Sequence, residues 1–147
     1  MKKNLLIAIS IAILSFGCTS DITGSSGKNK TKLNLENMDN KFTITTTAKN
    51  LTDYYHVNHY IVNSSGTKIL DEGTNYEGTV ITTCTRSVIS SSYIDYSCIT
   101  HWDTKSPVGD QNDERQNIRL YDSSDYNVFL KENSFNNSKT TKIGLIK

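Results

Sequence analysis

The chain has 147 residues, and its 16 Lys and Arg residues nearly balance its 15 Asp and Glu residues. This length suits one domain with a single modest hydrophobic core. Because basic and acidic side chains are mixed along the sequence, it lacks the clustered basic face that phosphate backbones need, and a nucleic-acid partner is excluded.

The first segment has the pattern of an export signal. A short cationic start with Lys2 and Lys3 precedes residues 5–16, which carry no charge. A membrane-spanning helix needs about 20 apolar residues, whereas the hydrophobic part of a signal peptide needs only about 7 to 15. The sequence therefore predicts a signal peptide over residues 1–17. Its removal takes away Lys2 and Lys3, which leaves 14 basic residues against 15 acidic ones.

The hydrophobic run ends at Ser15-Phe16-Gly17-Cys18, which resembles the lipobox of bacterial lipoproteins. The resemblance covers residues 1–20. It departs from the commonest Leu-Ala-Gly-Cys form, because serine stands three places before the cysteine and Leu14 stands one place further back. The resemblance implies cleavage before Cys18, a diacylglycerol on its thiol and often a fatty acid such as palmitate on its amine. The alternative is an ordinary secreted protein with a chance cysteine near its cleavage site.

Residues 18–32 follow the predicted anchor and are small and polar, with Ile22 as the one strongly apolar side chain. Such a composition buries too little surface to fold, so this segment is predicted to be a flexible tether. Thr19 stands where many lipoproteins retained at the inner membrane have Asp, which implies outer-membrane sorting under the enterobacterial rule. We therefore expect a bacterial cell-envelope protein held in the lipid bilayer through acylated Cys18.

Residues 33–147 form the predicted globular domain. They are rich in Thr, Ser, Asn, Tyr, Ile and Val, and no long stretch has helical periodicity, which favours strands. Short strands at regular spacing predict an all-β fold, an antiparallel β-sandwich of about seven or eight strands. The predicted strands cover residues 42–48, 54–62, 67–71, 79–88, 93–102, 117–122, 126–131 and 140–146.

The opening strands of this domain resemble those of small immunoglobulin-like domains in bacterial envelope proteins. The resemblance rests on residues 41–52, which contain an Asn-x-Thr step, and on residues 57–62 followed by the turn Asn63-Ser64-Ser65-Gly66. It implies an immunoglobulin-like sandwich that serves as an interaction module instead of an enzyme, although a fold alone does not fix a function.

Cys84 and Cys98 lie at equal distances from Ser91, the centre of a polar run. If that run is a hairpin tip, antiparallel pairing sets Cys84 opposite Cys98 and makes the apolar faces of both strands coincide, which a slip of one residue would destroy. Opposed Cα atoms are about 4.5 to 5.5 Å apart, near disulfide reach, and exported thiols oxidise. The sequence therefore predicts a Cys84–Cys98 disulfide. The same register pairs Val88 with Ile94, Arg86 with Tyr96, Thr82 with Thr100 and Val80 with core-facing Trp102.

Few side chains suggest a catalytic or metal-binding role. Cys84 with a histidine base would suit a thiol hydrolase, but the structural disulfide is the favoured interpretation. His56 and His59 have a spacing that would place both rings on one side only in a helix, so on a strand they are expected to be partly buried sheet residues on opposite faces. His101 and Asp103 would join a site only through long-range folding.

The polar residues 103–116 form the longest predicted connection inside the domain. Their carboxylates Asp110, Asp113 and Glu114 would suit calcium by residue type, but their spacing matches no calcium loop. A solvated connector is therefore favoured, although long loops on β scaffolds often bind ligands.

Two classes of function remain. The favoured one is a non-catalytic envelope lipoprotein without a metal or cofactor that contacts an envelope or host protein, as an accessory of a membrane complex, an adhesin or an inhibitor. The alternative is an extracytoplasmic hydrolase that uses His101 and Asp103, with a nucleophile that no motif identifies.

Overall fold

The computed structural model describes residues 20–26, 28–37, 40–51, 56–107 and 112–146. The predicted signal peptide over residues 1–17 and the predicted lipidation site Cys18 lie outside these residues and stay predictions. Among the described residues, none belongs to a helix with the length and apolar character needed to cross a membrane.

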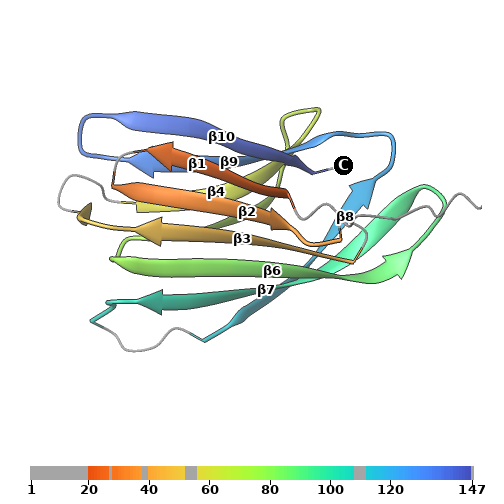
Figure 1. Cartoon of the computed structure of the whole chain (residues 1–147), viewed down its shortest axis with the longest axis horizontal. Coiled ribbons are helices and arrows are strands. Elements are labelled where there is room, and N and C mark those ends of the chain that lie inside the picture. The colour runs from red at the N-terminus through yellow and green to blue at the C-terminus, as the bar shows by residue number, and fades with distance from the viewer. Residues whose placement is uncertain (1–19, 27, 38–39, 52–55, 108–111, 147) are drawn as a thin grey trace, which may run out of the picture.

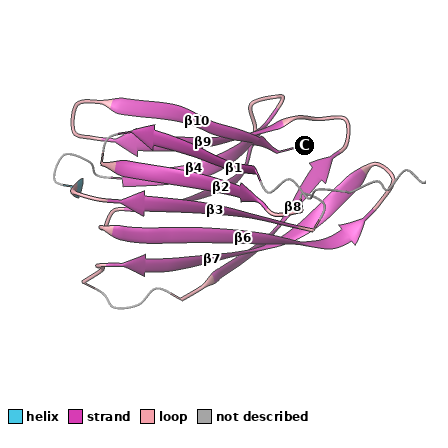
Figure 2. Ribbon diagram, viewed as in Figure 1, coloured by secondary structure: helices cyan, strands magenta, loops and turns pink. Residues whose placement is uncertain are grey.

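Within the described residues, ten strands form two antiparallel sheets that pack face to face (Figure 1). One sheet has the strand order β1-β2-β3-β6-β7-β8 and the other the order β10-β9-β4-β5. Figure 2 shows that strands account for most of the described chain, which confirms the all-β sandwich. The strands are β1 (Ser20–Ser26), β2 (Asn29–Leu35), β3 (Lys41–Ala48), β4 (His56–Asn63), β5 (Lys68–Thr74), β6 (Gly78–Ile89), β7 (Tyr93–Thr104), β8 (Glu114–Tyr121), β9 (Tyr126–Asn133) and β10 (Ser138–Ile146).

All eight strands expected from the sequence are present as β3 to β10, with ends shifted by at most a few residues. Alternating apolar and polar residues carry most of this agreement, because side chains along a strand point to opposite faces in turn. The turn after β4 is also as expected. Gly66 adopts a φ of +83°, which glycine tolerates best, and its N–H donates to the Asn63 carbonyl at 3.0 Å.

The flexible tether predicted over residues 18–32 is wrong for its described part, which forms β1 and most of β2. Backbone pairing runs from Ser20 opposite Leu35 to Ser26 opposite Asn29, and β2 in turn pairs with β3. A Cβ atom added at Gly24 would lie 2.2 Å from Cδ1 of Ile143, so the small residue lets β1 approach β10 closely. Backbone pairing and close approach therefore order a segment that is poor in apolar side chains, and the folded domain begins before residue 33.

The hydrophobic core lies between the two sheets. Phe42, Ile44 and Ala48 of β3 point into it, as the alternation predicts, and the phenyl ring of Phe42 meets the ring of Tyr96 edge to face at 5.1 Å between centroids. The other buried apolar residues of this core are Leu33, Leu35, Val57, Ile61, Leu70, Cys84, Cys98, Ile118, Leu120, Tyr126, Val128, Leu130, Ile143 and Ile146.

The β6–β7 hairpin contains the expected disulfide. Cys84 lies opposite Cys98 with their Cα atoms 4.0 Å apart, and the two sulfur atoms are bonded. The predicted pairing of Val80 with Trp102 is confirmed as well. Val80 is buried, whereas Trp102 is only half-buried and donates its indole N–H to the Gly73 carbonyl of β5 at 2.9 Å. The disulfide and this hydrogen bond together fix the hairpin within its sheet and against the other one.

Toward its turn the hairpin departs from the predicted register. Arg86 lies opposite Tyr96 as expected, but Val88 lies opposite Asp95 instead of Ile94, and Ile94 pairs with Ile89. Ser87 is the extra residue of a β-bulge between Arg86 and Val88. A bulge of this kind bends the strand and re-aims the side chains beyond it. The symmetry of the sequence about Ser91 therefore holds only up to Arg86.

Candidate functional site

The β6–β7 hairpin extends past the disulfide as an arm, defined here as residues 85–97 together with residues 117–121 of β8. At its base, the inward side chains of Tyr96, Ile118 and Leu120 still belong to the core. Strands β6 and β7 have 12 residues each, whereas the other strands have seven to nine. The arm curves away from the body of the sandwich at the end where β1 begins (Figure 1). Its turn is tied to the β8–β9 turn by a hydrogen bond from the Asp122 N–H to the Ser92 carbonyl, at 3.0 Å.

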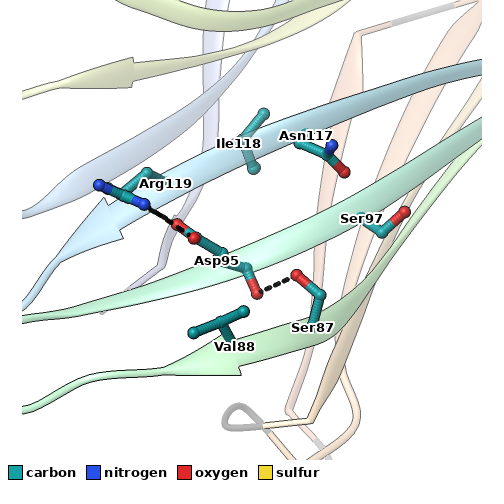
Figure 3. Close-up of a pocket in the computed structure, with 7 residues that line it drawn as sticks. All are labelled: Ser87, Val88, Asp95, Ser97, Asn117, Ile118 and Arg119. Carbon is teal, nitrogen blue, oxygen red and sulfur yellow. Dashed lines mark hydrogen bonds and ion pairs between the residues drawn. The ribbon is translucent and has the colours of Figure 1, made fainter.

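A hollow of about 540 Å³ lies on the arm beside the bulge (Figure 3). The bulged residue contributes to it directly, because the Ser87 hydroxyl donates to the Asp95 carbonyl at 3.1 Å. The hollow therefore lies at the register shift, and the alternation in the sequence gave no sign of it. Its lining comes from three adjacent strands and consists of Ser87, Val88, Asp95, Ser97, Asn117, Ile118 and Arg119.

An ion pair fixes the charge of this hollow. Arg119 donates from Nε to Oδ1 of Asp95 at 2.7 Å and from Nη2 to Oδ2 at 2.9 Å, and its guanidinium stacks 3.8 Å from the ring centroid of Tyr93. The hydrogen bond from Arg119 lowers the pKa of Asp95. Both side chains therefore stay charged near neutral pH. Because the two charges compensate each other, the hollow presents a bidentate ion pair without net charge.

The rest of the hollow supplies contacts suited to a protein surface. Val88 leaves 48% of its surface exposed beside the ion pair, and Asn117 is exposed on the neighbouring strand. Protein interfaces combine such exposed apolar side chains with arginine and with amide or hydroxyl groups that exchange hydrogen bonds. The geometry can therefore bind a surface through one apolar contact and several directional polar ones.

A second hollow, of about 300 Å³, lies at the end of the arm. Tyr93 and Tyr121 line it and meet edge to face with their centroids 6.2 Å apart, and the Tyr126 hydroxyl accepts a hydrogen bond from the Tyr121 N–H at 2.7 Å. Ile89 lines it too and leaves 58% of its surface exposed, while Tyr121 leaves 49% exposed. The end of the arm is thus the place where large apolar side chains gather at the surface.

The residues of the predicted hydrolase alternative are placed differently from what the sequence suggested. His101 and Asp103 are both exposed on β7, and Nδ1 of His101 lies 2.7 Å from Oδ1 of Asp113, not next to Asp103. Cys84 belongs to the disulfide and therefore has no thiol for nucleophilic attack. The structure thus pairs the histidine with a carboxylate from the following loop, and the hydrolase alternative stays a prediction.

The predicted connector of residues 103–116 is shorter than expected, because β7 continues to Thr104 and β8 begins at Glu114. Asp113 pairs with His101, and Asp110 lies outside the described residues. The structure groups no three His, Cys, Asp or Glu side chains in a way that could hold a metal ion, as far as the described ranges go.

His56 and His59 lie on opposite faces of β4, as expected, but His59 is fully buried. Its Nδ1 lies 2.8 Å from the Thr46 hydroxyl and its Nε2 lies 2.8 Å from the Thr82 hydroxyl, so the ring joins one sheet to the other. Thr31 and Thr100 extend this chain by hydrogen bonds of 3.0 and 2.9 Å. Desolvation by burial lowers the pKa of His59 to about 4, although Asp71 opposes the shift. The imidazole is therefore neutral in the core and links four buried threonines.

Glu72 lies directly opposite His59 on β5 and is also buried. Burial raises the pKa of Glu72 to about 7, and the Glu114 and Asp71 carboxylates add to that shift, while the hydrogen bond from the Gln116 amide opposes it. A buried carboxyl that titrates near neutral pH is a frequent mark of functional sites, yet ion networks in ordinary cores produce it too. In this protein the hydrogen bond between Gln116 and Glu72 links β8 of one sheet to β5 of the other.

The variant Glu72→Gln is expected to make the free energy of unfolding more dependent on pH between about 4 and 7. Because the pKa of His59 falls from 6.5 to about 4 on folding, its contribution destabilises the protein as the pH drops through that window. The pKa of Glu72 rises from 4.5 to about 7 on folding, so its stabilising contribution is present below 4.5 and is lost as the pH rises through 7. In the native protein, the contributions of His59 and Glu72 to the free energy of unfolding therefore change with pH in opposite directions.

Urea unfolding at several pH values checks this prediction. In the Glu72→Gln variant, protonation of His59 alone is expected to lower the free energy of unfolding by about 3 kcal/mol between pH 6.5 and 4. The exposed Asp125 provides the control variant Asp125→Asn, which should keep the shallow native profile. A Glu72→Gln profile as shallow as the native one would contradict the opposed titrations.

Comparison with known proteins adds no relative: no family model, no curated protein and no solved structure matches the chain. The resemblance to immunoglobulin-like envelope domains thus stays a prediction. The fold and the site by themselves define a two-sheet, disulfide-linked β-sandwich with a projecting hairpin arm.

Proposed function

We propose that this protein is a lipid-anchored lipoprotein of the bacterial cell envelope, held in the outer membrane by acylated Cys18, and that it acts as a non-catalytic module that binds another envelope protein. The binding surface in this proposal is the hollow beside the bulge of the arm. The observation that carries it is the exposed Val88 next to the Asp95–Arg119 ion pair, on an arm that reaches beyond the sandwich body.

The position of the arm favours a partner within the envelope over a distant one. Ser20, the first described residue, lies at the same end of the molecule as the arm, and Cys18 is only two residues before it. The anchor therefore keeps the hollow near the membrane, where an accessory protein of a membrane complex would meet its partner. An adhesin would instead profit from a binding surface at the far end.

The variant Cys18→Ser is expected to lose acylation and to leave the membrane fraction. The expectation rests on the cationic start, the uncharged residues 5–16 and the Gly17-Cys18 step that follows them. Metabolic labelling with an alkyne fatty acid, followed by fractionation of the cells, measures both effects. Undiminished labelling of the Cys18→Ser protein would rule out this residue as the lipid attachment site.

The variant Val88→Glu is expected to weaken capture of the envelope partner at least about tenfold, which corresponds to about 1.4 kcal/mol. It places an unpaired charge beside the hollow without changing a buried residue. The measurement is quantitative cross-linking in intact cells, followed by identification of the linked protein and titration with the purified pair.

Phe135→Glu is the matched control, because Phe135 is 81% exposed and lies in the β9–β10 turn at the opposite end of the sandwich. Both variants introduce the same charge at an exposed apolar position. If the two variants weaken capture equally, or if neither does, the arm is not the binding surface.

A further inference from the structure

The turn region of the arm has the composition of a membrane-contacting loop. Residues 89–94, called the tip here, contain no charged side chain. Ile89 is about half exposed, and the half-exposed ring of Tyr121 lies on the adjacent strand. Aliphatic side chains beside tyrosine and serine suit the boundary between water and lipid, where the ring is buried and the hydroxyl stays hydrated.

The register of the sheet shows how the tip is placed relative to the start of the domain. Ser20 lies opposite Leu35, whose neighbour Asn34 lies opposite Thr43, and Phe42 lies opposite Cys84. Ser20 is therefore nearly level with the disulfide. The tip extends four residue pairs beyond that level, which is about 13 Å along the strands at the usual rise per residue.

The predicted lipid attachment site lies within reach of the same level. Cys18 precedes Ser20 by two residues, and two residues span at most about 7 Å. Whatever path those residues take, the diacylglycerol cannot lie far beyond the end of the sandwich from which the arm projects. The tip therefore extends at least as far in that direction as the point where the lipid would be attached.

We propose that the tip of the arm contacts the lipid bilayer in the anchored protein, so that the anchor and the tip together fix the orientation of the domain. This inference rests on the proposed acylation of Cys18. The contact is shallow, because its apolar part consists of Ile89 and the ring of Tyr121, while Val88 lines the separate hollow proposed for the protein partner. The exposed carboxylates Asp122 and Asp125 in the adjoining turn favour zwitterionic over anionic lipid.

The opposite end of the sandwich cannot share this contact. The β9–β10 turn lies at the far end of the strands from the arm (Figure 1), and Phe135 is the most exposed large apolar residue there. Two exposed apolar positions, one at each end, therefore distinguish a bilayer contact of the tip from general adhesion of apolar side chains to lipid.

The test uses the full-length acylated protein in vesicles of phosphatidylcholine and phosphatidylethanolamine, with and without brominated acyl chains that quench tryptophan fluorescence on contact. Ile89→Trp and Phe135→Trp are compared after subtraction of the emission of Trp102, which is present in both. We expect the added emission at position 89 to be largely lost in brominated vesicles and that at position 135 to be unchanged. A second measurement needs no substitution: amide hydrogen exchange of residues 89–94 in the native protein should slow when it is bound to vesicles.

Each outcome decides the inference. Equal quenching at both positions, or none at position 89, overturns it. Exchange at residues 89–94 that slows only with a protein partner, and not on vesicles, also overturns it and assigns the tip to a protein interface. If Cys18 is not acylated, the lipid-anchor proposal fails and this inference fails with it. If Cys18 is acylated and the protein floats with vesicles while position 89 stays unquenched, only the tip contact is refuted.

Discussion

Replacing His59 with alanine is expected to lower the free energy of unfolding by about 3 to 5 kcal/mol, the range for removing a large buried ring. The imidazole is fully buried and is hydrogen-bonded to Thr46 and Thr82 on the facing sheet. The variant would leave a cavity and remove both cross-sheet hydrogen bonds. Thr46 keeps its hydrogen bond with Thr31, and Thr82 keeps its hydrogen bond with Thr100. The cavity therefore accounts for most of the loss of stability, and the two missing hydrogen bonds add to it.

His56→Ala is the matched control, because His56 is only half-buried and its Nδ1 bonds with Asn75 at an exposed position. That variant is expected to change the free energy of unfolding by less than about 1 kcal/mol. Chemical denaturation at pH 7.5, where the buried His59 is neutral, gives the comparison. Equal losses for the two variants would show that the threonine chain does not depend on the imidazole.

Replacing both Cys84 and Cys98 with alanine is expected to destabilise the domain by about 3 kcal/mol, within the usual range of about 2 to 5. The bond joins residues that are 14 positions apart, so it closes a short loop in the unfolded chain. Both cysteines are fully buried in the core, and the added alanines leave space that the sulfur atoms now fill. The effect should be largest on the arm, which begins directly after the bond.

Peptide mapping without reduction accompanies the stability measurement. It should recover one linked pair from the native protein, and the Cys18→Ser variant should contain no free thiol. Reductant added to the folded native protein should act slowly, because neither sulfur is accessible, whereas reductant in urea should reproduce the stability of the double variant. Free thiol at Cys84 or Cys98 in the untreated protein would refute the bond.

Much of this fold could be predicted from the sequence, because its strands are regular. Alternation in β3 placed Phe42, Ile44 and Ala48 on one face, because successive side chains along a strand point to opposite faces of the sheet. The equal spacing of Cys84 and Cys98 about Ser91 determined the hairpin register up to Arg86, because only that register buries both apolar faces.

Other features depended on contacts between residues far apart in the chain. Strands β1 and β2 form from a polar segment because β3 offers backbone partners to β2, β2 offers them to β1, and Gly24 lets β1 pack closely on Ile143 of β10, which no local pattern records. His59 became a central core residue only because Thr46 and Thr82 of the other sheet meet its two nitrogens.

The candidate site was decided by tertiary structure alone. One extra residue at Ser87 shifts the β6–β7 register and sets Val88 opposite Asp95, while the regular β7–β8 pairing sets Asp95 opposite Arg119, so these side chains line one hollow. Sequence alternation defines which face a side chain occupies, but a bulge changes that relation locally and leaves no periodic signal. The sequence by itself determined strands β3 to β10 and the disulfide and predicts the anchor, whereas the packing of three twisted strands determined the shape of the surface that we propose for binding.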